Sequence, residues 1–532
     1  MKAKKPAIEK FEIVLLLSIF LVTTASIVVS MDLNSINPDE EIYLFIGKAL
    51  SEGSYGEPGT YMYDYLHRLP LVPSLVSLSV LMGFGIAGAR FFIPILFMNL
   101  LVFSTYIFTK TLYGKKGAIV SVLFVLTFPF FWRWGLSILT DIPIAAFSVL
   151  FLLLFYIGIE KEKKYLPLSA LSLSNGLILK PSVLLFLVPA FLYLLLRKRL
   201  SLLKSKETII SIIIIPAVFF GVFYIYHRLF SATMLIDYQT TFFSSGWDIS
   251  EIYQFALAPT LLLTCVGAIV ALQAMRKQDK YVLMNGAVFI SFFLYTGHLR
   301  LRYLAPLIPL MAALAAVGFF KLKEKTKITN SLLVILLFIA FVSSIFLIDL
   351  QNKTLWGVEE LSRYVNGIEG EATIATEYFP HYLKASTSKN IVLLPEIVEF
   401  NGRKIDIEEF LKILSNGSQP EHSLAVEMVK SGNFSTSKPF EYSWFKENGV
   451  DYVILSIYSD YGRSGKSAYF HPAFGPFEVP FISRPYSNGR VPPDYAFSSD
   501  LYVQMESTDK YKMIKEIRNN EGQVIFLIYE VI

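Results

Sequence analysis

Acidic residues gather in one short stretch near the N-terminus. Asp39, Glu40 and Glu41 follow an Asn-Pro pair, and Asp141 stands in a similar setting later, shortly before a proline. A positioned carboxylate can take a proton from an attacking hydroxyl group. The same residues in a first helical turn also serve as ordinary caps, because peptide N–H groups and the helix dipole favour negative charge there. Both interpretations stay open from these residues alone.

The residues behind this acidic stretch predict how it is held. Pro38 is suited to the first position of a helix, where its missing N–H has no partner to lose. Ile42, Phe45, Ile46 and Ala49 then recur at helical spacing and form one apolar stripe. We therefore expect a short amphipathic helix that lies on a membrane surface and carries its carboxylates at its N-terminal tip.

Lys180 is a second residue whose setting suggests chemistry. It stands where two short apolar stretches meet, in the sequence Leu179-Lys180-Pro181-Ser182. Short, proline-interrupted apolar segments are where membrane proteins tend to build binding sites. A lysine at the tip of such a helical hairpin offers a point charge to a phosphate at the level of lipid head groups. The alternative is a lysine that simply extends its ammonium group to the membrane surface.

The elements that must position these residues are mostly membrane helices. Of 532 residues, 54% are hydrophobic and 17% are charged, which is more apolar surface than soluble cores could bury. The single cysteine, Cys265, allows neither a disulfide framework nor a cysteine metal site. We expect a polytopic α-helical membrane protein whose apolar stretch 11–29 is an uncleaved first helix.

The distribution of Lys and Arg predicts the topology. Further apolar segments cover residues 69–88, 91–109, 117–132, 142–159, 165–179, 181–196, 208–226, 252–274, 281–296, 303–320 and 328–348. Short cytoplasmic loops carry an excess of Lys and Arg. The basic loops are residues 2–10, 110–116, 161–164, 197–206, 276–280 and 321–327. These loops fall on one side only if 69–88 lies along the membrane surface without crossing it. This gives about 11 transmembrane helices, with the N-terminus in the cytoplasm and the C-terminal region outside.

Several cations remain on the outer side, where few are expected. They are Arg68, Arg90, Arg133, Lys180, Arg228, Arg300 and Arg302, joined by His67, His227 and His298. Cations placed against the charge bias near a membrane need an anionic partner. For any single residue, the expected partner is a nearby carboxylate that forms an ion pair with it. For the whole set, gathered on one face with carboxylates, a bound phosphate is the better interpretation.

The order of these residues resembles that of the GT-C membrane glycosyltransferases. The resemblance is carried by Asp39-Glu40 in the first outer loop, Asp141 in the second, Lys180 at a hairpin tip and residues 302–309 near the last spans. Residues 10–320 are most similar to the protein O-mannosyltransferases and the lipid A aminoarabinose transferase. The resemblance implies a GT-C fold with juxtamembrane helices in the first outer loop, in an integral, multi-pass protein of the plasma membrane.

The resemblance also implies a reaction. An inverting glycosyltransferase of this kind moves a sugar from a polyprenyl monophosphate, dolichyl or undecaprenyl, to an acceptor hydroxyl on the outer face. Asp39 is the expected base, Glu40 the reserve candidate, and Asp141 would orient the partners of Asp39 or contact the acceptor. The donor phosphate would be bound by Lys180, Arg302, Arg68, Arg133 and Arg300. The expected partners are this donor, a protein, glycan or lipid acceptor, and membrane lipid, without nucleic acid.

A metal is a further candidate at this site. The first outer loop has no Asp-x-Asp pattern, and Lys and Arg can neutralise a monophosphate leaving group without a divalent ion. Asp64, His67 and His227 could nevertheless contact the acceptor or bind a divalent metal. Histidines in such settings more often act as hydrogen-bond partners. No other cofactor is expected.

The hydropathy falls near residue 349, after which strand-like runs alternate with helical stretches. Strands are expected at 373–376, 391–394, 452–457 and 524–531, and helices at 355–366 and 407–414. We therefore expect a transmembrane catalytic domain at 1–348 and an extracytoplasmic α/β domain at 349–532. Its position beside the outer loops suggests that the second domain binds the acceptor or acts as a lid.

Two other functions fit parts of the sequence. An oligosaccharyltransferase with a pyrophosphate donor would carry metal-binding carboxylate pairs and a tryptophan-rich acceptor motif, whereas the C-terminal region holds Trp356 and Trp444 far apart. A lipid or solute transporter would spread polar residues through the middle of several spans. The ionisable residues here lie at the outer rim, which favours an active site at the membrane surface.

Overall fold

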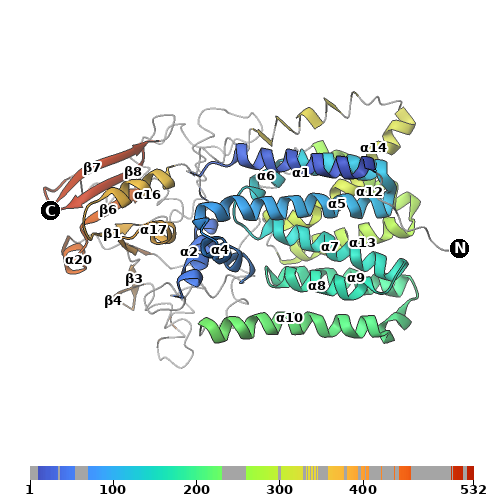
Figure 1. Cartoon of the computed structure of the whole chain (residues 1–532), viewed down its shortest axis with the longest axis horizontal. Helices are drawn as coiled ribbons and strands as arrows, with labels where there is room; N and C mark the ends of the chain where they lie inside the picture. The colour runs from blue at the N-terminus through green and yellow to red at the C-terminus, as the bar shows by residue number, and fades with distance from the viewer. Residues whose placement is uncertain are drawn as a thin grey trace. The chain divides into compact units, whose positions relative to one another are not determined.

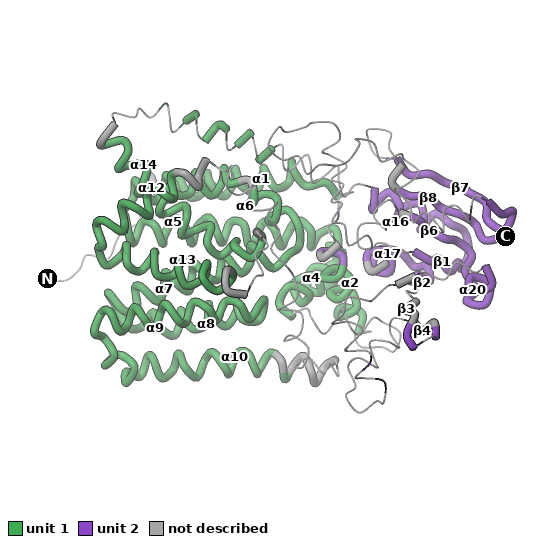
Figure 2. The backbone as a smooth tube through the Cα atoms, turned by 180° about the vertical axis from the view of Figure 1, so that it is seen from behind, with its two compact units in different colours: residues 1–33, 42–351 green, residues 34–41, 352–532 purple. Residues whose placement is uncertain are grey.

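The computed structural model describes most of the helical region and parts of the C-terminal region (Figure 1). The described residues are 10–33, 36, 38–53, 70–230, 259–296, 301–326, 331, 334–335, 337–339, 341–342, 344–345, 357–376, 380–393, 397–401, 403–406, 421, 424, 436–437, 442–456, 505, 507–518 and 524–532. They form two compact units, coloured separately in Figure 2. Unit 1 comprises Met1–Leu33 and Ile42–Gln351, and unit 2 comprises Asn34–Glu41 and Asn352–Ile532.

Unit 1 is a bundle of helices (Figure 1). Its α-helices are α1 (Lys10–Ser30), α2 (Pro38–Glu52), α4 (Leu71–Leu81), α5 (Gly85–Leu126), α6 (Pro129–Gly135), α7 (Asp141–Glu160), α8 (Tyr165–Leu177), α9 (Leu187–Leu196), α10 (Lys206–Phe230), α12 (Pro259–Ala274), α13 (Lys277–Thr296) and α14 (Ile308–Thr326). Its 3₁₀ helices are η1 (Pro181–Phe186), η2 (Leu200–Lys204) and η4 (Leu301–Leu307). The first turn of α2 belongs to unit 2 and the rest of it to unit 1.

Several of these helices have the length and composition of membrane spans. Within the described residues, four helices are long and apolar enough to cross a membrane: Glu12–Ser30, Gly85–Leu126, Asp141–Glu160 and Arg302–Glu324. Large apolar side chains are exposed along α1, α9 and α10. Helices satisfy their backbone hydrogen bonds internally, so such apolar surfaces can face lipid.

Helix α4 lies in the segment 69–88, which is predicted to lie along the membrane surface. It covers 11 residues, or about 16 Å, whereas the hydrocarbon layer is about 30 Å thick. The helix is followed by Gly83 and Gly85, which have positive φ angles of 83° and 65° and turn the chain into α5. The helix by itself is therefore too short to cross this layer.

Helix α2 begins at Pro38, as predicted, and packs against α4. Phe45, Ile46 and Ala49 of its expected apolar stripe are buried. Gly47 allows the close approach, because a Cβ atom there would lie 2.4 Å from the Cβ of Val76. The part of α2 that belongs to unit 1 thus packs against α4.

The segment predicted to contain two spans, at 91–109 and 117–132, forms two helical pieces. The range of α5 covers both pieces, which are separated at Gly114, whose φ of 84° and ψ of 176° are not helical. The second piece stops before residue 132 because Phe128 precedes Pro129 and is extended, with φ −79° and ψ 115°. A new short helix, α6, then starts at Pro129.

Helices α12 and α14 cross at two glycines. A Cβ atom at Gly267 would lie 1.8 Å from the carbonyl oxygen of Leu314, and one at Gly318 would lie 2.4 Å from that of Leu263. Small residues let helix backbones approach closely where hydrophobic attraction between helices is weak, as in lipid. This crossing fixes α14, which continues directly from η4.

Unit 2 contains a five-stranded sheet in the order β2-β1-β6-β8-β7. Its strands are β1 (Thr373–Thr376), β2 (Asn390–Leu393), β6 (Tyr452–Ser456), β7 (Tyr511–Arg518) and β8 (Val524–Val531). Strand β1 pairs in parallel with β2 and β6, whereas β8 pairs antiparallel with β6 and β7. The four predicted strands are present as β1, β2, β6 and β8, and β7 is an addition.

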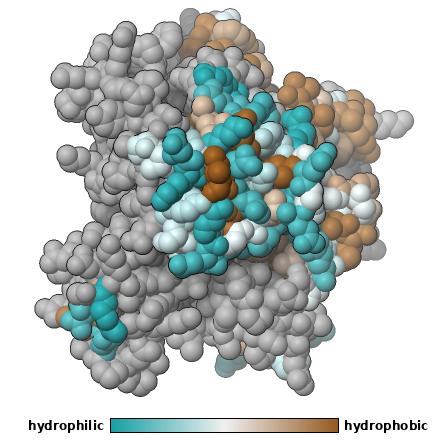
Figure 3. Space-filling view, turned by 90° about the vertical axis from the view of Figure 1, so that its left-hand side faces the viewer, coloured by the Kyte–Doolittle hydropathy of each residue, from teal (hydrophilic) through white to brown (hydrophobic). Residues whose placement is uncertain are grey.

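Helices and a small second sheet complete the described part of unit 2. The helices are α16 (Val358–Gly367), α17 (Pro380–Ser386) and α20 (Tyr442–Glu447), and β3 (Ile397–Phe400), β4 (Arg403–Asp406) and β5 (Thr436–Ser437) form the antiparallel sheet β4-β3-β5. The predicted helix at 355–366 corresponds to α16, and the one at 407–414 lies outside the described residues. The surface of this unit in Figure 3 is largely hydrophilic, as expected for a domain in water.

Candidate functional site

Lys180 and Arg302 come together on one aromatic ring. The Nζ atom of Lys180 lies 3.7 Å from the ring centroid of Tyr303, and the guanidinium carbon of Arg302 lies 5.5 Å from the same centroid. All three side chains are partly buried. A cation within about 6 Å of a ring face is attracted by the electrons of the ring. Two predicted phosphate ligands, separated by more than 100 residues in sequence, thus converge in the fold.

The sequence around Lys180 explains its position at the tip of a hairpin. Its N–H donates to the carbonyl of Gly176 at 2.9 Å, which closes the end of α8. Its backbone is extended, with φ −164° and ψ 132°, because the residue before a proline is disfavoured in helical conformation. Pro181 then begins η1. Gly176 lets the two arms approach, because a Cβ there would lie 2.9 Å from Val183.

The ring of Tyr303 is held by a row of aromatic side chains. It stacks on Phe293 with centroids 6.0 Å apart, and Phe293 contacts Phe289 at 5.1 Å. Phe289 stacks in turn on Phe186 at 5.0 Å. The end of α13 is therefore packed against both η1 and η4, and it fixes the distance between Lys180 and Tyr303.

Asp141 lies at the first position of α7, where its side chain is buried. Helix α7 packs against η1 and η4. The preceding α6, which carries the partly buried Arg133, packs against α7 and η4 as well. Since α6 lies just before Asp141 in the chain, the start of α7 is the end that faces η4. Asp141 and Arg133 therefore belong to the same region of unit 1 as Lys180 and Arg302.

The acidic stretch of α2 divides into residues of different kinds. Asp39 lies in the first turn, and its side chain is outside what the structure describes. Glu40 is 1% exposed and Glu41 is 6% exposed. A carboxylate oxygen of Glu41 accepts a hydrogen bond of 3.1 Å from the backbone N–H of Tyr382, near the start of α17. Glu41 thus caps a helix of unit 2, as carboxylates near helix N-termini do.

Tyr382 extends this contact into the rest of unit 2. Its side chain is buried, and its hydroxyl donates a hydrogen bond to the carboxylate of Glu359 on α16. The helical turn that carries Asp39 is therefore joined through Glu41 to α17 and α16. The sequence alone did not reveal this role, because the partners Glu41 and Tyr382 are 341 positions apart.

Arg90 is occupied by backbone carbonyl groups. Arg90 is 3% exposed, and its guanidinium donates to the carbonyl of Leu33 at 2.7 Å and to that of Asp32 at 3.4 Å. These two residues follow α1 and lead toward α2. Arg90 thus fixes the start of the loop that precedes the acidic helix, although the charge distribution grouped it with the phosphate-binding cations.

The remaining predicted site residues are not described in full. Arg68, Arg300, Asp64, His67 and His298 lie outside the described residues, and the side chains of His227 and Arg228 in the last turn of α10 do as well. In the part of the chain that is described, no group of three or more His, Cys, Asp or Glu residues could bind a metal ion. Metal binding therefore stays a prediction that concerns Asp64, His67 and His227.

A bundle of apolar helices with a pair of short helices, an α/β unit and convergent cations at helix ends defines a class of membrane protein. A family model described as Dolichyl-phosphate-mannose-protein mannosyltransferase matches residues 68–226. A second, described as the Alg9-like mannosyltransferase family, matches residues 247–372. No curated protein matches the chain.

Solved structures share the fold over nearly the whole chain. ArnT from Cupriavidus metallidurans bound to undecaprenyl phosphate is similar with a TM-score of 0.63 and 12% identity, over 98% of both chains. AglB from Archaeoglobus fulgidus, an archaeal oligosaccharyltransferase in complex with an inhibitory peptide and a dolichol-phosphate, has a TM-score of 0.56 and 12% identity, over 96% of this chain and 80% of the other. The arabinofuranosyltransferase AftD from Mycobacteria has a TM-score of 0.52 and 12% identity, over 97% of this chain and 40% of the other.

The family matches and the shared fold lead to the same class. The chain is an integral membrane glycosyltransferase of the GT-C fold, with mannosyltransferase-like sequence segments. The predicted resemblance and the predicted enzyme class are thereby confirmed.

Proposed function

We propose that this enzyme transfers a sugar, with inversion, from a polyprenyl monophosphate carrier to an acceptor hydroxyl on the outer face of the membrane. The observation that carries the proposal is the convergence of Lys180 and Arg302 on Tyr303. Two like charges held near one another are stabilised by an anion, and a phosphate is the anion such donors bring. The ArnT and AglB structures contain undecaprenyl phosphate and a dolichol-phosphate, respectively.

The residues can be assigned to steps of this reaction. The acceptor oxygen attacks the anomeric carbon while Asp39 takes the proton of the hydroxyl group. The bond between the anomeric carbon and the phosphate oxygen breaks, and the leaving polyprenyl phosphate keeps the electron pair. Lys180 and Arg302 neutralise the charge that develops on this phosphate. Asp39 is preferred to Glu40 and Glu41, since both of those carboxylates are buried and Glu41 caps α17.

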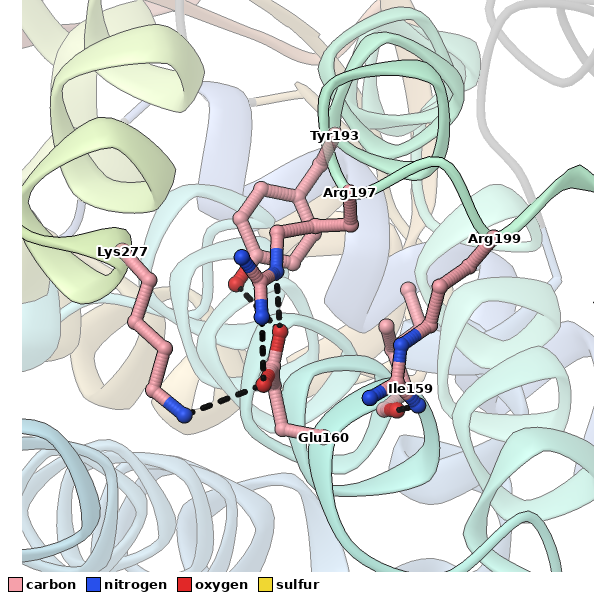
Figure 4. Close-up of polar contacts among 6 residues, drawn as sticks. All are labelled: Ile159, Glu160, Tyr193, Arg197, Arg199 and Lys277. Atoms are coloured by element: carbon pink, nitrogen blue, oxygen red, sulfur yellow. Dashed lines mark hydrogen bonds and ion pairs between the residues drawn. The ribbon is translucent and has the colours of Figure 1, made fainter.

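The orientation of the helices is part of this proposal, and contacts inside unit 1 support it. Lys110 pairs with Glu12 at 2.6 Å, and the guanidinium of Arg276 lies 5.9 Å from the ring of Tyr113. Glu160 pairs with Arg197 and Lys277 at 2.8 and 3.0 Å (Figure 4). Residues in or next to five of the basic loops are thus connected at one end of the bundle, as a common cytoplasmic side requires.

Purified protein incubated with undecaprenyl- and dolichyl-phosphate sugars tests the proposal. The wild type should release polyprenyl phosphate in the presence of an acceptor. Asp39→Asn and Lys180→Ala should lose turnover and keep their thermal stability, whereas Lys321→Ala, which changes an exposed lysine, should behave as the wild type. Full activity of Asp39→Asn would refute the base assignment. Turnover with pyrophosphate donors alone would favour an oligosaccharyltransferase, and movement of intact lipid across vesicles without bond cleavage would favour a transporter.

A further inference from the structure

Three helices of unit 1 are tied together at Glu160, the last residue of α7 (Figure 4). One carboxylate oxygen accepts hydrogen bonds from Arg197 Nε at 2.8 Å and from the Tyr193 hydroxyl at 2.9 Å. The other accepts from Lys277 Nζ at 3.0 Å and from Arg197 Nη2 at 3.3 Å. The Glu160 side chain is 4% exposed. We call Glu160, Tyr193, Arg197 and Lys277 the Glu160 network.

The same three helices lead to the candidate phosphate site at their other ends. Helix α7 starts at Asp141, and the η1–α9 segment that ends before Arg197 starts after Lys180. Helix α13 starts at Lys277 and leads toward η4, which contains Tyr303. A helix of 20 residues such as α7 or α13 is about 30 Å long. The Glu160 network and the phosphate site therefore lie at opposite ends of shared helices.

One stripe of α13 connects the two ends. Tyr281, four positions after Lys277, is fully buried. Its ring lies 4.8 Å from that of Tyr193 and 5.2 Å from that of Tyr156, and its hydroxyl donates to the carbonyl of Leu152 at 2.8 Å. The ionic contacts of Lys277 thus continue directly into contacts of α13 with α7 and α9.

The stripe continues at the same four-residue spacing. Asn285 is fully buried and donates to the Tyr281 carbonyl at 2.7 Å. Phe289 stacks on Phe186 of η1, and Phe293 stacks on Tyr303 of η4. Phe186, Phe289 and Phe293 are buried and Tyr303 is partly buried. A shift of α13 along its axis would therefore move the ring that Lys180 lies on.

Polar contacts between helices can prevent such a shift. Between membrane helices there is little hydrophobic attraction, and apolar surfaces can pack in more than one register. A buried carboxylate with four hydrogen bonds accepts one arrangement of its partners, since unpairing it is costly. The Glu160 network therefore defines where α13 stands relative to α7 and α9.

We propose that the Glu160 network is a positioning device for the donor-phosphate site: it sets the axial position of α13 and thereby keeps Tyr303 against Lys180. Glu160 is a positioning residue, since it acts through α13 at a distance of a whole helix. This inference rests on the proposed function, which supplies the phosphate ligand. The connection between Glu160 and Tyr303 rests on the contacts along α13.

The test compares Glu160→Gln, which keeps the shape of the side chain and removes its charge, with Glu324→Gln. Glu324 also pairs with a lysine at 3.0 Å, but within α14 and at 67% exposure, so it is a matched control. Binding of undecaprenyl phosphate to the full-length protein should weaken by about twofold to thirtyfold in Glu160→Gln. The KM for the donor should rise while the KM for the acceptor stays unchanged, and Lys277→Arg should retain wild-type values.

Hydrogen exchange supplies a readout that needs no ligand. In Glu160→Gln, peptides from the second half of α13 and from η4 should exchange faster than in the wild type, whereas Glu324→Gln should leave them unchanged. Faster exchange confined to the residues around Glu160 would overturn the inference, as would wild-type lipid affinity in Glu160→Gln when Lys180→Ala has lost it. Absence of undecaprenyl phosphate binding in the wild type would instead overturn the proposed function, and the exchange data would still decide the positioning role.

Discussion

Replacement of Tyr303 by leucine tests the structure of the candidate site most closely. The ring lies 3.7 Å from Lys180 Nζ and 5.5 Å from the guanidinium carbon of Arg302, so Tyr303→Leu removes two cation–ring contacts. Each such contact contributes about 0.5–1 kcal/mol at partly exposed sites. Without these contacts the two cations are less well preorganised, and the free energy of phosphate binding should become about 1–2 kcal/mol less favourable. This corresponds to a roughly 5- to 30-fold weaker affinity for a polyprenyl phosphate.

The assay is the binding of undecaprenyl phosphate to Tyr303→Leu and Tyr303→Phe in detergent. The phenylalanine variant keeps the ring and its stacking on Phe293, so it should bind within a factor of about two of the wild type. Wild-type affinity in Tyr303→Leu would refute the view that the ring organises the cations. Equal losses in both variants would assign the effect to the hydroxyl group instead.

Three further predictions concern contacts within one unit or the other, and thermal unfolding of the purified protein measures each. Gly267→Ala should lower the free energy of unfolding by about 1–3 kcal/mol, because its Cβ atom would meet the backbone of α14. Gly221→Ala, whose Cβ would have nothing within 4 Å, should be neutral or slightly stabilising. Equal effects of the two substitutions would contradict the close crossing of α12 and α14. Glu41→Ala should lower the free energy of unfolding by about 1–3 kcal/mol, because it leaves the N–H of Tyr382 without its partner. Glu41→Gln should recover much of this loss. A Glu41→Ala variant as stable as the wild type would contradict the capping role. Burial, with a smaller contribution from Tyr442, raises the pKa of Tyr511 to about 12. The contribution of Tyr511 to stability should therefore be complete below pH 10 and be lost between about pH 10 and 12. In this range the wild type should lose stability more steeply than Tyr511→Phe. Parallel losses in the two proteins would contradict the raised pKa of Tyr511.

Local sequence rules were sufficient where neighbours in the chain determine the structure. Pro38 starts α2, and the lysine before Pro181 lies at the hairpin tip, because proline restricts both its own φ and the residue before it. The early end of α5 follows from the same rule at Pro129, which the hydropathy of 117–132 had hidden. The strands β1 and β6 were predicted because their apolar runs are short and bounded by turn residues.

Features that depend on distant contacts could not be read in this way. The partner of Glu41 is 341 positions away, and no periodicity connects the two. Tyr303 lies within residues 302–309, which contribute to the resemblance, but only the fold places its ring against Lys180. Strand β7 was missed because a register shift between Met513 and Lys515 breaks the alternation of its side chains. The identity of the sugar and the acceptor depends likewise on pocket shape, which residue spacing does not encode.

The most direct test of the account is a cryo-electron microscopy structure of the full-length protein with undecaprenyl phosphate. We predict phosphate density within about 4 Å of both Lys180 Nζ and the Arg302 guanidinium, the distance of an ion pair. The lipid phosphate at any other place on the protein, with Lys180 and Arg302 bound to protein groups alone, would contradict the central claim.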